Sequence, residues 1–219
     1  MSEAAPETAS SGLRERKKRK KRERILSAAR ALFLEHGFEG TTTRAISEAA
    51  GIGAGTLFTY FRDKRSLLVH LFVDDIEAQV ARAAERLDPD APIVDQAMHM
   101  FGACFDFYGQ DLELSRTIVK NLLFLDPEDS AHLDGATFGF LQRIAGRIAV
   151  AQARGEVRSS VDPLAAATCF FGQYYVALIA WTSGNFGGRE TVEALLRGSL
   201  ELIRDGLVPV ANSQEPRDM

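Results

Sequence analysis

The chain has 219 residues, of which 46% are hydrophobic and 26% charged, so it carries enough apolar material for a sizeable core and wholesale disorder is excluded. Its formal net charge of −4 hides an asymmetry. Residues 1–66 carry 14 basic and 8 acidic side chains, a net +6, whereas residues 67–219 carry 12 and 22, a net −10. The two parts therefore suit different partners.

The basic excess is concentrated between Arg14 and Arg24, where nine Lys or Arg residues stand against two Glu, a net +7. A polyanion suits this basic arm best, because each cation that neutralises a phosphate releases condensed counterions. A membrane surface or an acidic protein would suit it less well. A solvated charged tail is the alternative interpretation.

Two cysteines, Cys104 and Cys169, lie far apart within apolar runs, which favours buried, inert thiols in a reducing compartment over a disulfide framework. No apolar stretch follows the basic N-terminal residues, so export is not expected and the predicted location is cytoplasmic. Residues 163–188 contain no Asp, Glu, Lys or Arg, but their polar side chains and four glycines argue against a membrane span.

The first helix is predicted from a stripe of apolar side chains that starts near Arg16 and stops before Gly37, a residue suited to a left-handed helix end. Two short helices follow, with Gly51 between them. One begins after the hydroxyl caps of residues 41–43, and the other is expected from about Ala54 to Phe61.

Longer helices are predicted from the same three- and four-residue apolar period over residues 63–87, 94–108, 118–123, 138–148, 163–181 and 192–205. No sustained two-residue alternation occurs, so the chain is predicted to be all-α with about nine helices. The expected divisions are a disordered tail over 1–13, a three-helix domain with the basic arm over 14–66, a larger helical domain over 67–208, and a disordered tail over 209–219.

Two short helices joined through Gly51 have the form of a helix-turn-helix. The chain must turn sharply at this point, and a left-handed conformation costs residues other than glycine about 1–2 kcal/mol. The face of the second helix that does not pack would then be available for a major groove. A turn glycine between short helices also occurs in ordinary helical hairpins.

Residues 24–72 match a fuller pattern, namely R-I-L-x-A-A-x-x-L-F-x-x-x-G-F-x-x-T-T followed by R-x-I-x-x-x-A-G-I-x-x-G-T-L-F-x-Y-F-x-x-K-x-x-L-L. This stretch resembles the DNA-binding domain of the TetR family of transcriptional regulators. The resemblance implies a two-domain, all-helical homodimer that binds a pseudo-palindromic operator in double-stranded DNA. It also implies that a small molecule in the larger domain releases the DNA.

Matched residue by residue, the resemblance implies DNA contacts by Thr42, Thr43, Arg44, Gly55, Thr56, Thr59, Tyr60 and Lys64. Hydroxyl groups and Arg44 would reach phosphates or base edges, Gly55 would allow close approach, and Lys64 would clamp one further phosphate. Helix capping is the alternative role of Thr42, and plain surface is the alternative for the others.

The recognition helix departs from the family pattern at Gly53, Ala54 and Phe58, where serine, lysine and tyrosine are common, and Ala45 stands where an acidic residue would complete a capping box. This helix thus lacks a cap and two or three polar contacts. We expect the basic arm to compensate by tracking the DNA backbone or entering the adjoining minor groove, with DNA contacts from Arg19, Lys20 and Arg22.

The charge-free helix over 163–181 and the last helix present more apolar surface than one monomer is expected to cover. The resemblance implies that these two helices form a four-helix bundle across a two-fold axis. A wholly intramolecular core is the alternative. The predicted dimer contacts are Phe170, Tyr174, Leu178, Trp181, Val192, Leu195, Leu196, Ser199 and Ile203.

An effector cavity in the larger domain is expected to be lined by its aromatic and apolar residues, namely Met98, Phe101, Phe105, Tyr108, Phe124, Phe138, Leu141 and Tyr174. Polar candidates are His99, Asp106, Asn121, Gln142 and Gln173. Core packing is the alternative role for each apolar residue. We therefore expect a mostly apolar or aromatic effector.

A small-molecule-transforming helical enzyme and a membrane-associated helical protein are the alternative function classes. The four histidines and two cysteines form no HExxH motif and no CxxC pair, and neither a glycine-rich phosphate loop nor a GxSxG motif occurs. No catalytic residue, metal or cofactor is therefore predicted. The expected function is that of a sequence-specific transcriptional repressor released from its operator by a small effector.

Overall fold

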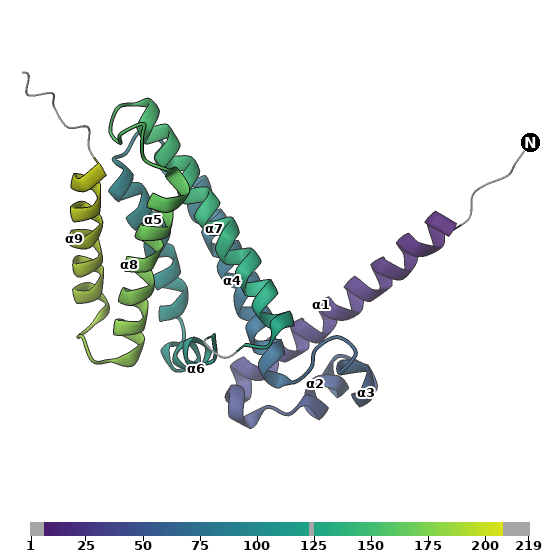
Figure 1. Ribbon diagram of the computed structural model, residues 1–219. Coiled ribbons are helices and arrows are strands. Elements are labelled where there is room, and N and C mark those ends of the chain that lie inside the picture. The colour runs from purple at the N-terminus through teal and green to yellow at the C-terminus, as the bar shows by residue number, and fades with distance from the viewer. Residues whose placement is uncertain (1–6, 123–124, 208–219) are drawn as a thin grey trace, which may run out of the picture. The chain divides into compact units, whose positions relative to one another are not determined.

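The computed structural model describes residues 7–122 and 125–207, and within these ranges the chain forms nine helices and no strand (Figure 1). The helices are α1 (Glu7–Gly40), α2 (Thr43–Ala49), α3 (Ala54–Leu57), α4 (Lys64–Glu85), α5 (Ile93–Gly109), α6 (Leu112–Leu122), α7 (Pro127–Ala153), α8 (Pro163–Ser183) and α9 (Arg189–Leu207). The all-α prediction is confirmed. Phe124 and the predicted tail over 209–219 lie outside the described residues.

The N-terminal helix is longer than the sequence predicts. It begins at Glu7, so residues 7–13, expected to be a loose tail, are helical. Apolar periodicity marks only helices that bury a face, and no residue from Gly12 to Lys20 is buried. The predicted end at Gly37 is confirmed, because Gly37 has a φ of 72° and interrupts the helical backbone.

The chain divides into two compact units, residues 1–73 and residues 74–219. The division falls part-way along α4, later than the boundary expected after residue 66. The first turns of α4 share the core of the N-terminal unit: Leu67 is fully buried, and the ring of His70 meets that of Phe61 edge-on at 5.3 Å between centroids.

The N-terminal unit holds α2 and α3 against α1 through a small apolar core. Ile25 and Ala29 of α1, Ile46 of α2 and Leu57 of α3 are fully buried. Gly51 joins α2 to α3 with a φ of 62°, a left-handed conformation that favours glycine. The predicted helix-turn-helix is thus present.

The second of the two short helices is shorter than predicted. α3 ends at Leu57, and the chain continues to Phe61 through turns, with the amide of Thr59 donating to the Thr56 carbonyl at 3.1 Å. The Thr59 hydroxyl donates to the same carbonyl at 2.7 Å. The Thr59 hydroxyl thus bonds to the backbone of the preceding turn, as threonine side chains do at turns.

The C-terminal unit is built around α5, which packs against α6, α7, α8 and α9. α8 lies between α7 and α9. Its predicted start is confirmed, because Asp162 accepts a hydrogen bond from the amide of Ala165 at 2.7 Å and Pro163 occupies the first helical turn. Gly184, with a φ of 74°, ends α8.

By length and composition alone α8 could cross a membrane, but here it packs between two neighbouring helices.

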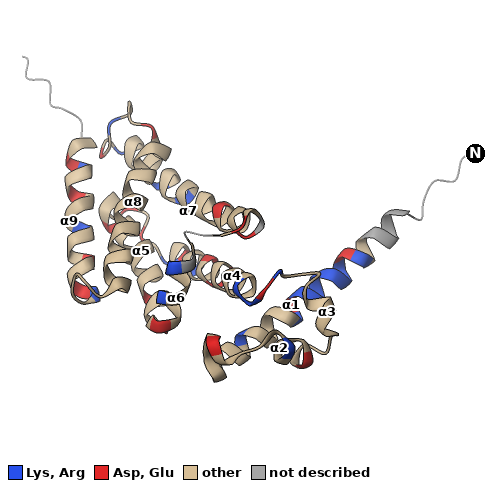
Figure 2. Cartoon of the chain, turned by 60° about the horizontal axis from the view of Figure 1, so that its bottom comes forward, with Lys and Arg blue, Asp and Glu red and all other residues tan. Residues whose placement is uncertain are grey.

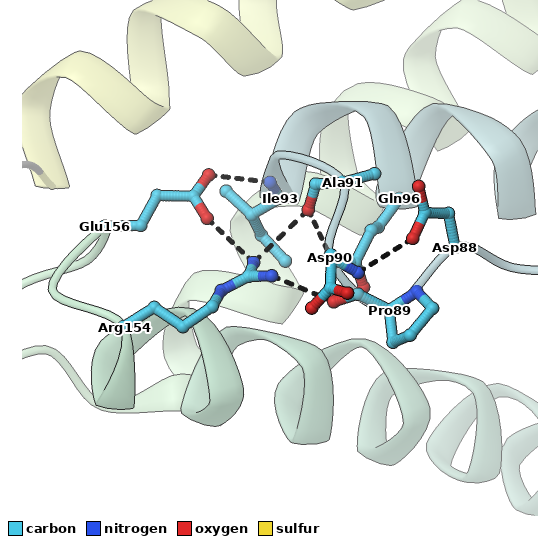
Figure 3. A network of polar contacts seen from close by, with 8 residues as sticks. All are labelled: Asp88, Pro89, Asp90, Ala91, Ile93, Gln96, Arg154 and Glu156. Carbon is cyan, nitrogen blue, oxygen red and sulfur yellow. Dashed lines mark hydrogen bonds and ion pairs between the residues drawn. The ribbon is translucent and has the colours of Figure 1, made fainter.

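A polar network ties the segment after α4 to the end of α7 (Figure 3). The guanidinium of Arg154 donates to the carbonyls of Pro89 at 2.9 Å and Ala91 at 3.2 Å. Arg154 also pairs with Glu156 at 3.0 Å, and the second oxygen of Glu156 accepts a bond from the amide of Ile93 at 2.7 Å. One arginine therefore fixes the connection between α4 and α5.

Candidate functional site

The start of α2 presents the first group of predicted DNA contacts. Thr42 is exposed and its hydroxyl oxygen accepts a bond from the amide of Ala45 at 3.1 Å, so it caps α2 as the alternative interpretation holds. Its hydroxyl proton is still available to a phosphate. Thr43 is half-buried, and the exposed Arg44 pairs with Glu48 at 2.9 Å.

α3 and the turn after it present a surface without charge. Gly55 and Thr59 are exposed, Thr56 and Tyr60 are half-buried, and Phe58 is 53% exposed. From Gly51 to Phe61 the chain has no Lys, Arg, Asp, Glu, Asn or Gln, and Figure 2 shows α3 free of charged positions. The only side-chain hydrogen-bonding groups of this recognition segment are the hydroxyls of Thr56, Thr59 and Tyr60.

Lys64, the predicted phosphate clamp, is engaged inside the protein. Its ammonium donates to the carbonyls of Phe38 at 2.6 Å and Thr41 at 3.0 Å, and lies 4.3 Å from the centre of the Phe38 ring. Carbonyls near a helix end attract cations, so these contacts stabilise the connection between α1 and α2. The structure therefore gives Lys64 a structural role in the free protein.

The basic arm divides into two groups of cations. Arg22 is half-buried, with its guanidinium 3.0 Å from Nδ1 of His70 and above the ring of Phe61. Arg24 donates to the carbonyls of Ala50 and Gly51, in the turn between α2 and α3.

Arg19 and Lys20 lie further toward the N-terminus and are exposed, like every other residue from Gly12 to Lys20. Figure 2 shows the basic positions following one another along this part of α1. The residues predicted to contact DNA from the basic arm therefore differ in their surroundings. Arg22 belongs to the packed unit, whereas Arg19 and Lys20 face solvent.

Three of the predicted effector residues, Phe101 and Phe105 of α5 and Tyr174 of α8, come together in one buried aromatic cluster. Phe101 stacks on Tyr174 at 4.7 Å between ring centroids, and Phe105 meets Tyr174 and Trp181 edge-on at 5.6 Å each. All four rings are buried. Trp181, predicted as a dimer contact, thus belongs to this cluster.

The remaining predicted effector residues lie apart from the buried cluster or at its edge. Met98 and Leu141 are half-buried, and Phe138 is 53% exposed. Phe140 was missed: it is buried, and its ring lies 5.7 Å from that of Phe101. The signal was present in the sequence, because the apolar residues 140, 144, 148 and 151 form a better helical stripe than the one that includes Phe138.

Three polar groups are buried among these rings. Tyr174 hydrogen bonds with Cys104 and Tyr108, and all three side chains are buried. Burial raises the pKa of the Cys104 thiol to about 12 and also raises the pKa of both tyrosines. The cluster therefore offers uncharged hydroxyl and thiol groups at physiological pH.

Cys169, in contrast, is exposed, so the expectation that both thiols are buried was wrong.

The predicted polar effector residues have other roles or positions. Nε2 of His99 lies 3.0 Å from the Ala83 carbonyl, and Asp106 pairs with Arg189 at 2.7 Å. Gln173 is half-buried and Gln142 exposed. The side chain of Asn121 lies outside the described residues. In the described ranges, no three His, Cys, Asp or Glu side chains gather in a way that could hold a metal ion.

The dimer contacts predicted on α8 and α9 are mostly used within the chain itself. Phe170, Tyr174, Leu178, Trp181, Val192 and Leu196 are buried, Ser199 and Ile203 are half-buried, and Leu195 alone is exposed. The exposed apolar residues of these two helices include Val176, Ile179 and Leu202, which the sequence analysis missed. An entirely uncharged helix has no polar face, so its sequence does not show which side is covered.

Residues 25–71, which contain the helix-turn-helix, match the sequence model of the protein family described as bacterial regulatory proteins, tetR family. The transcriptional repressor AcnR of Corynebacterium efficiens is 31% identical over 141 residues, 64% of this chain and 70% of that protein. The fatty acid metabolism regulator protein of Bacillus subtilis is 22% identical over 192 residues, 88% of this chain and 98% of that protein.

Solved structures share the fold over nearly their whole length. FadR of Thermus thermophilus, a TetR-family repressor solved with lauroyl-CoA, has a TM-score of 0.69 at 23% identity and covers 88% of this chain and 98% of its own. FadR of Bacillus subtilis, solved with stearoyl-CoA, has a TM-score of 0.64 at 22% identity over 84% and 98%. With its helix-turn-helix, its nine described helices and these relatives, the chain belongs to the TetR family of DNA-binding transcriptional regulators.

Proposed function

We propose that the protein is a dimeric transcriptional repressor of the cytoplasm that releases its operator when a fatty-acyl thioester binds to its C-terminal unit. The observation that carries this proposal is the extent of the similarity to the Bacillus subtilis fatty acid metabolism regulator. That similarity covers 88% of this chain and so includes the C-terminal unit as well as the helix-turn-helix.

Operator binding is assigned to α2 and the recognition segment from Gly51 to Phe61. Thr42, Thr43 and Arg44 would contact phosphates at the start of α2, while Gly55, Thr56, Thr59 and Tyr60 face the major groove. Lys64 acts indirectly, because its ammonium is held by two carbonyls between α1 and α2. It positions α2 in this proposal.

Dimer formation is assigned to the exposed, uncharged face of α8 and α9. On α8 this face contains Cys169, Gly172, Val176 and Ile179, which follow one another at helical spacing, and on α9 it contains Ala194, Leu195 and Leu202. Packing against a second copy would remove this apolar surface from water. Two copies would also present two recognition segments to half-sites roughly 34–36 Å apart.

Effector binding is assigned to the aromatic cluster around Tyr174. An acyl chain suits the rings of Phe101, Phe105 and Trp181, and the uncharged Tyr108 and Tyr174 hydroxyls can donate to a thioester carbonyl. These side chains already fill the space around one another, so an acyl chain must displace some of them. A ligand that binds only the displaced arrangement shifts the protein toward it, which is what release from DNA requires.

The test uses full-length protein and a duplex selected by that protein from a random pool. Fluorescence anisotropy of the labelled duplex is followed while lauroyl-CoA, coenzyme A or laurate is added. We expect lauroyl-CoA to release the duplex and coenzyme A to leave it bound. If acyl-CoAs of short, medium and long chain all leave the complex intact, the effector class is wrong. If no sequence is enriched from the pool, operator binding itself is wrong.

The same mixtures separate a regulator from an enzyme. A regulator returns the thioester unchanged, whereas a thioester-cleaving enzyme would produce free coenzyme A. Chromatography of the ligand after prolonged incubation measures this directly. We expect intact lauroyl-CoA, because the buried Cys104 thiol has its pKa raised to about 12 by burial and is therefore a poor nucleophile at neutral pH.

A further inference from the structure

The first turns of α1 form a helix that the protein's own core does not support. α1 begins at Glu7, and from Gly12 onward its first buried residue is Ile25. With a rise of 1.5 Å per residue, the part from Arg14 to Ile25 is about 16 Å long. This helical extension therefore has no folding role that burial could explain.

Seven cations in this extension stand before the two arginines that pack on the unit. They are Arg14, Arg16, Lys17, Lys18, Arg19, Lys20 and Lys21, of which all but the half-buried Lys21 are exposed. Arg19 pairs with Glu23 at 3.6 Å, with both side chains more than half exposed. An exposed pair of this kind contributes little to stability, so the cations remain available to a polyanion.

The spacing of these cations works against the free helix. Arg14 and Lys18, Arg16 and Lys20, and Lys17 and Lys21 are each four residues apart, so like charges are neighbours on the helix surface. Such pairs destabilise a helix, and no apolar face compensates here. A row of phosphates next to the extension would remove this repulsion.

The base of the extension is fixed beside the turn of the helix-turn-helix. Arg24 donates to the carbonyls of Ala50 and Gly51, and Arg22 contacts His70 and the Phe61 ring. A Cβ at Gly51 would lie 2.9 Å from the Arg24 guanidinium, so the glycine also makes room for this contact. The direction of α1 is thereby coupled to the position of the recognition segment.

We propose that residues 14–21 form a second DNA-binding site, a helical arm that binds backbone phosphates next to the half-site occupied by α3. This inference rests on the proposed operator binding. A helix with its side chains is about 10–12 Å across, whereas the minor groove is about 6 Å wide. Of the two modes expected from the sequence, the helical form therefore favours tracking of the backbone over entry into an undeformed minor groove.

Phosphate contacts carry no sequence information, so the arm raises the affinity for every duplex by a similar factor. The dependence on salt gives its signature. Each phosphate contact adds about 0.9 to the slope of log K against log salt concentration, and an arm in place on the backbone should contribute several such contacts.

The test compares two full-length variants that each lose four exposed cations. R16Q/K17Q/K18Q/K20Q changes the arm, and R82Q/R86Q/K120Q/R143Q is the matched control in the C-terminal unit. We expect the arm variant to lose affinity for the selected duplex and a scrambled duplex by the same factor, with the salt slope reduced by about 2–4. The control should keep the wild-type slope.

An unchanged salt slope in the arm variant would overturn the inference about the arm. Operator binding would still stand in that case if the wild-type protein preferred the selected duplex to the scrambled one. The helical form is tested separately with Lys18→Pro and Lys18→Gln, which lose the same charge. Proline interrupts a helix, so K18P should bind more weakly than K18Q. Equal affinities would show that the arm does not act as a helix.

Discussion

Gly55 stands at a helical position where the fold itself does not require a glycine. A Cβ at this position would meet no heavy atom within 4 Å, and its φ is not positive. Glycine within a helix costs about 0.5–1 kcal/mol relative to alanine, so the fold alone would favour a larger residue. Under the proposed operator binding, close approach to DNA would account for the glycine.

Gly55→Leu should therefore separate stability from function. We expect the free energy of unfolding to stay unchanged or rise by up to about 1 kcal/mol, because the site is open and helical. Affinity for the selected duplex should fall more than about tenfold, since the new side chain holds α3 away from the groove. Gly139→Leu, at an equally open position of α7, should leave DNA affinity unchanged. Wild-type affinity in G55L would contradict the assignment.

Phe58 and its neighbours favour thymine recognition. The recognition segment has hydroxyls, methyl groups and a 53% exposed phenyl ring, but no amide or charged group that could form a bidentate bond with a base. Alanine, threonine methyls and phenylalanine are the side chains that contact the thymine methyl.

Replacing thymine by uracil in the selected half-sites removes only that methyl group. We expect this to weaken binding of the wild-type protein several-fold, and Phe58→Ala to weaken it on the thymine duplex. The two losses should not add when combined, as measured by a double-mutant cycle in the anisotropy assay. Additive losses would show that Phe58 does not contact the methyl.

The two cysteines should react at very different rates. At pH 8 an aromatic disulfide reagent should modify Cys169 quickly in the monomeric chain, where it is exposed, and more slowly in the dimer, where the proposed interface covers it; it should modify Cys104 only when the protein unfolds. Cys169→Ser should remove the fast phase. A fast second phase in native protein would contradict the buried position of Cys104.

Burial of Cys104 also sets the direction of a pH effect on stability. Its pKa rises from 9.0 to about 12, so above pH 9 the unfolded chain loses a proton that the folded chain keeps. The contribution to the free energy of unfolding is fully present below pH 9 and is lost as the pH rises toward 12. Denaturant titrations between pH 8 and 10.5 should show this decline, and a smaller one in Cys104→Ala.

At the level of elements, the exposed face of α8 should control assembly. Val176 is 64% exposed, and Val176→Glu would place a charge in the proposed interface. We expect this variant to be monomeric in light scattering and to lose affinity for the two-half-site duplex. Leu34 of α1 is 72% exposed and serves as the control, because Leu34→Glu adds the same charge elsewhere. A dimeric V176E would contradict this interface.

Helix ends could be predicted from the sequence where a single residue determines them. Asp162 and Pro163 start α8, and Gly37 ends the main part of α1, because caps and left-handed positions act locally. The start of α1 could not be predicted this way, since its extension has no apolar face. The end of α3 at Leu57 could not be predicted either, because no glycine or proline marks it in the sequence.

The helix-turn-helix followed from the sequence because many of its residues fit one pattern. The buried aromatic cluster followed less completely, because α7 carries two apolar stripes and the weaker one, with Phe138, was predicted in place of the one with Phe140. The role of Lys64 required three-dimensional information, because its two carbonyl partners precede it by 23 and 26 residues.

At the level of the whole molecule, effector and operator must affect each other equally. If lauroyl-CoA lowers the affinity for the duplex by some factor, saturating duplex must lower the affinity for lauroyl-CoA by the same factor. Calorimetric titration of lauroyl-CoA with and without duplex measures the second factor, and anisotropy measures the first. Unequal factors would mean that release occurs by another route, such as consumption of the thioester.

The polar network around Arg154 has a mechanical consequence for α4. It fixes the segment that directly follows α4, a helix of 22 residues and thus about 33 Å in length. A tilt of about 5° around that fixed end would carry the first residue of α4 sideways by about 3 Å, close to the 3.4 Å step between successive nucleotides of a strand. A small angular change of α4 would therefore be enough to shift a recognition segment by about one nucleotide relative to its half-site.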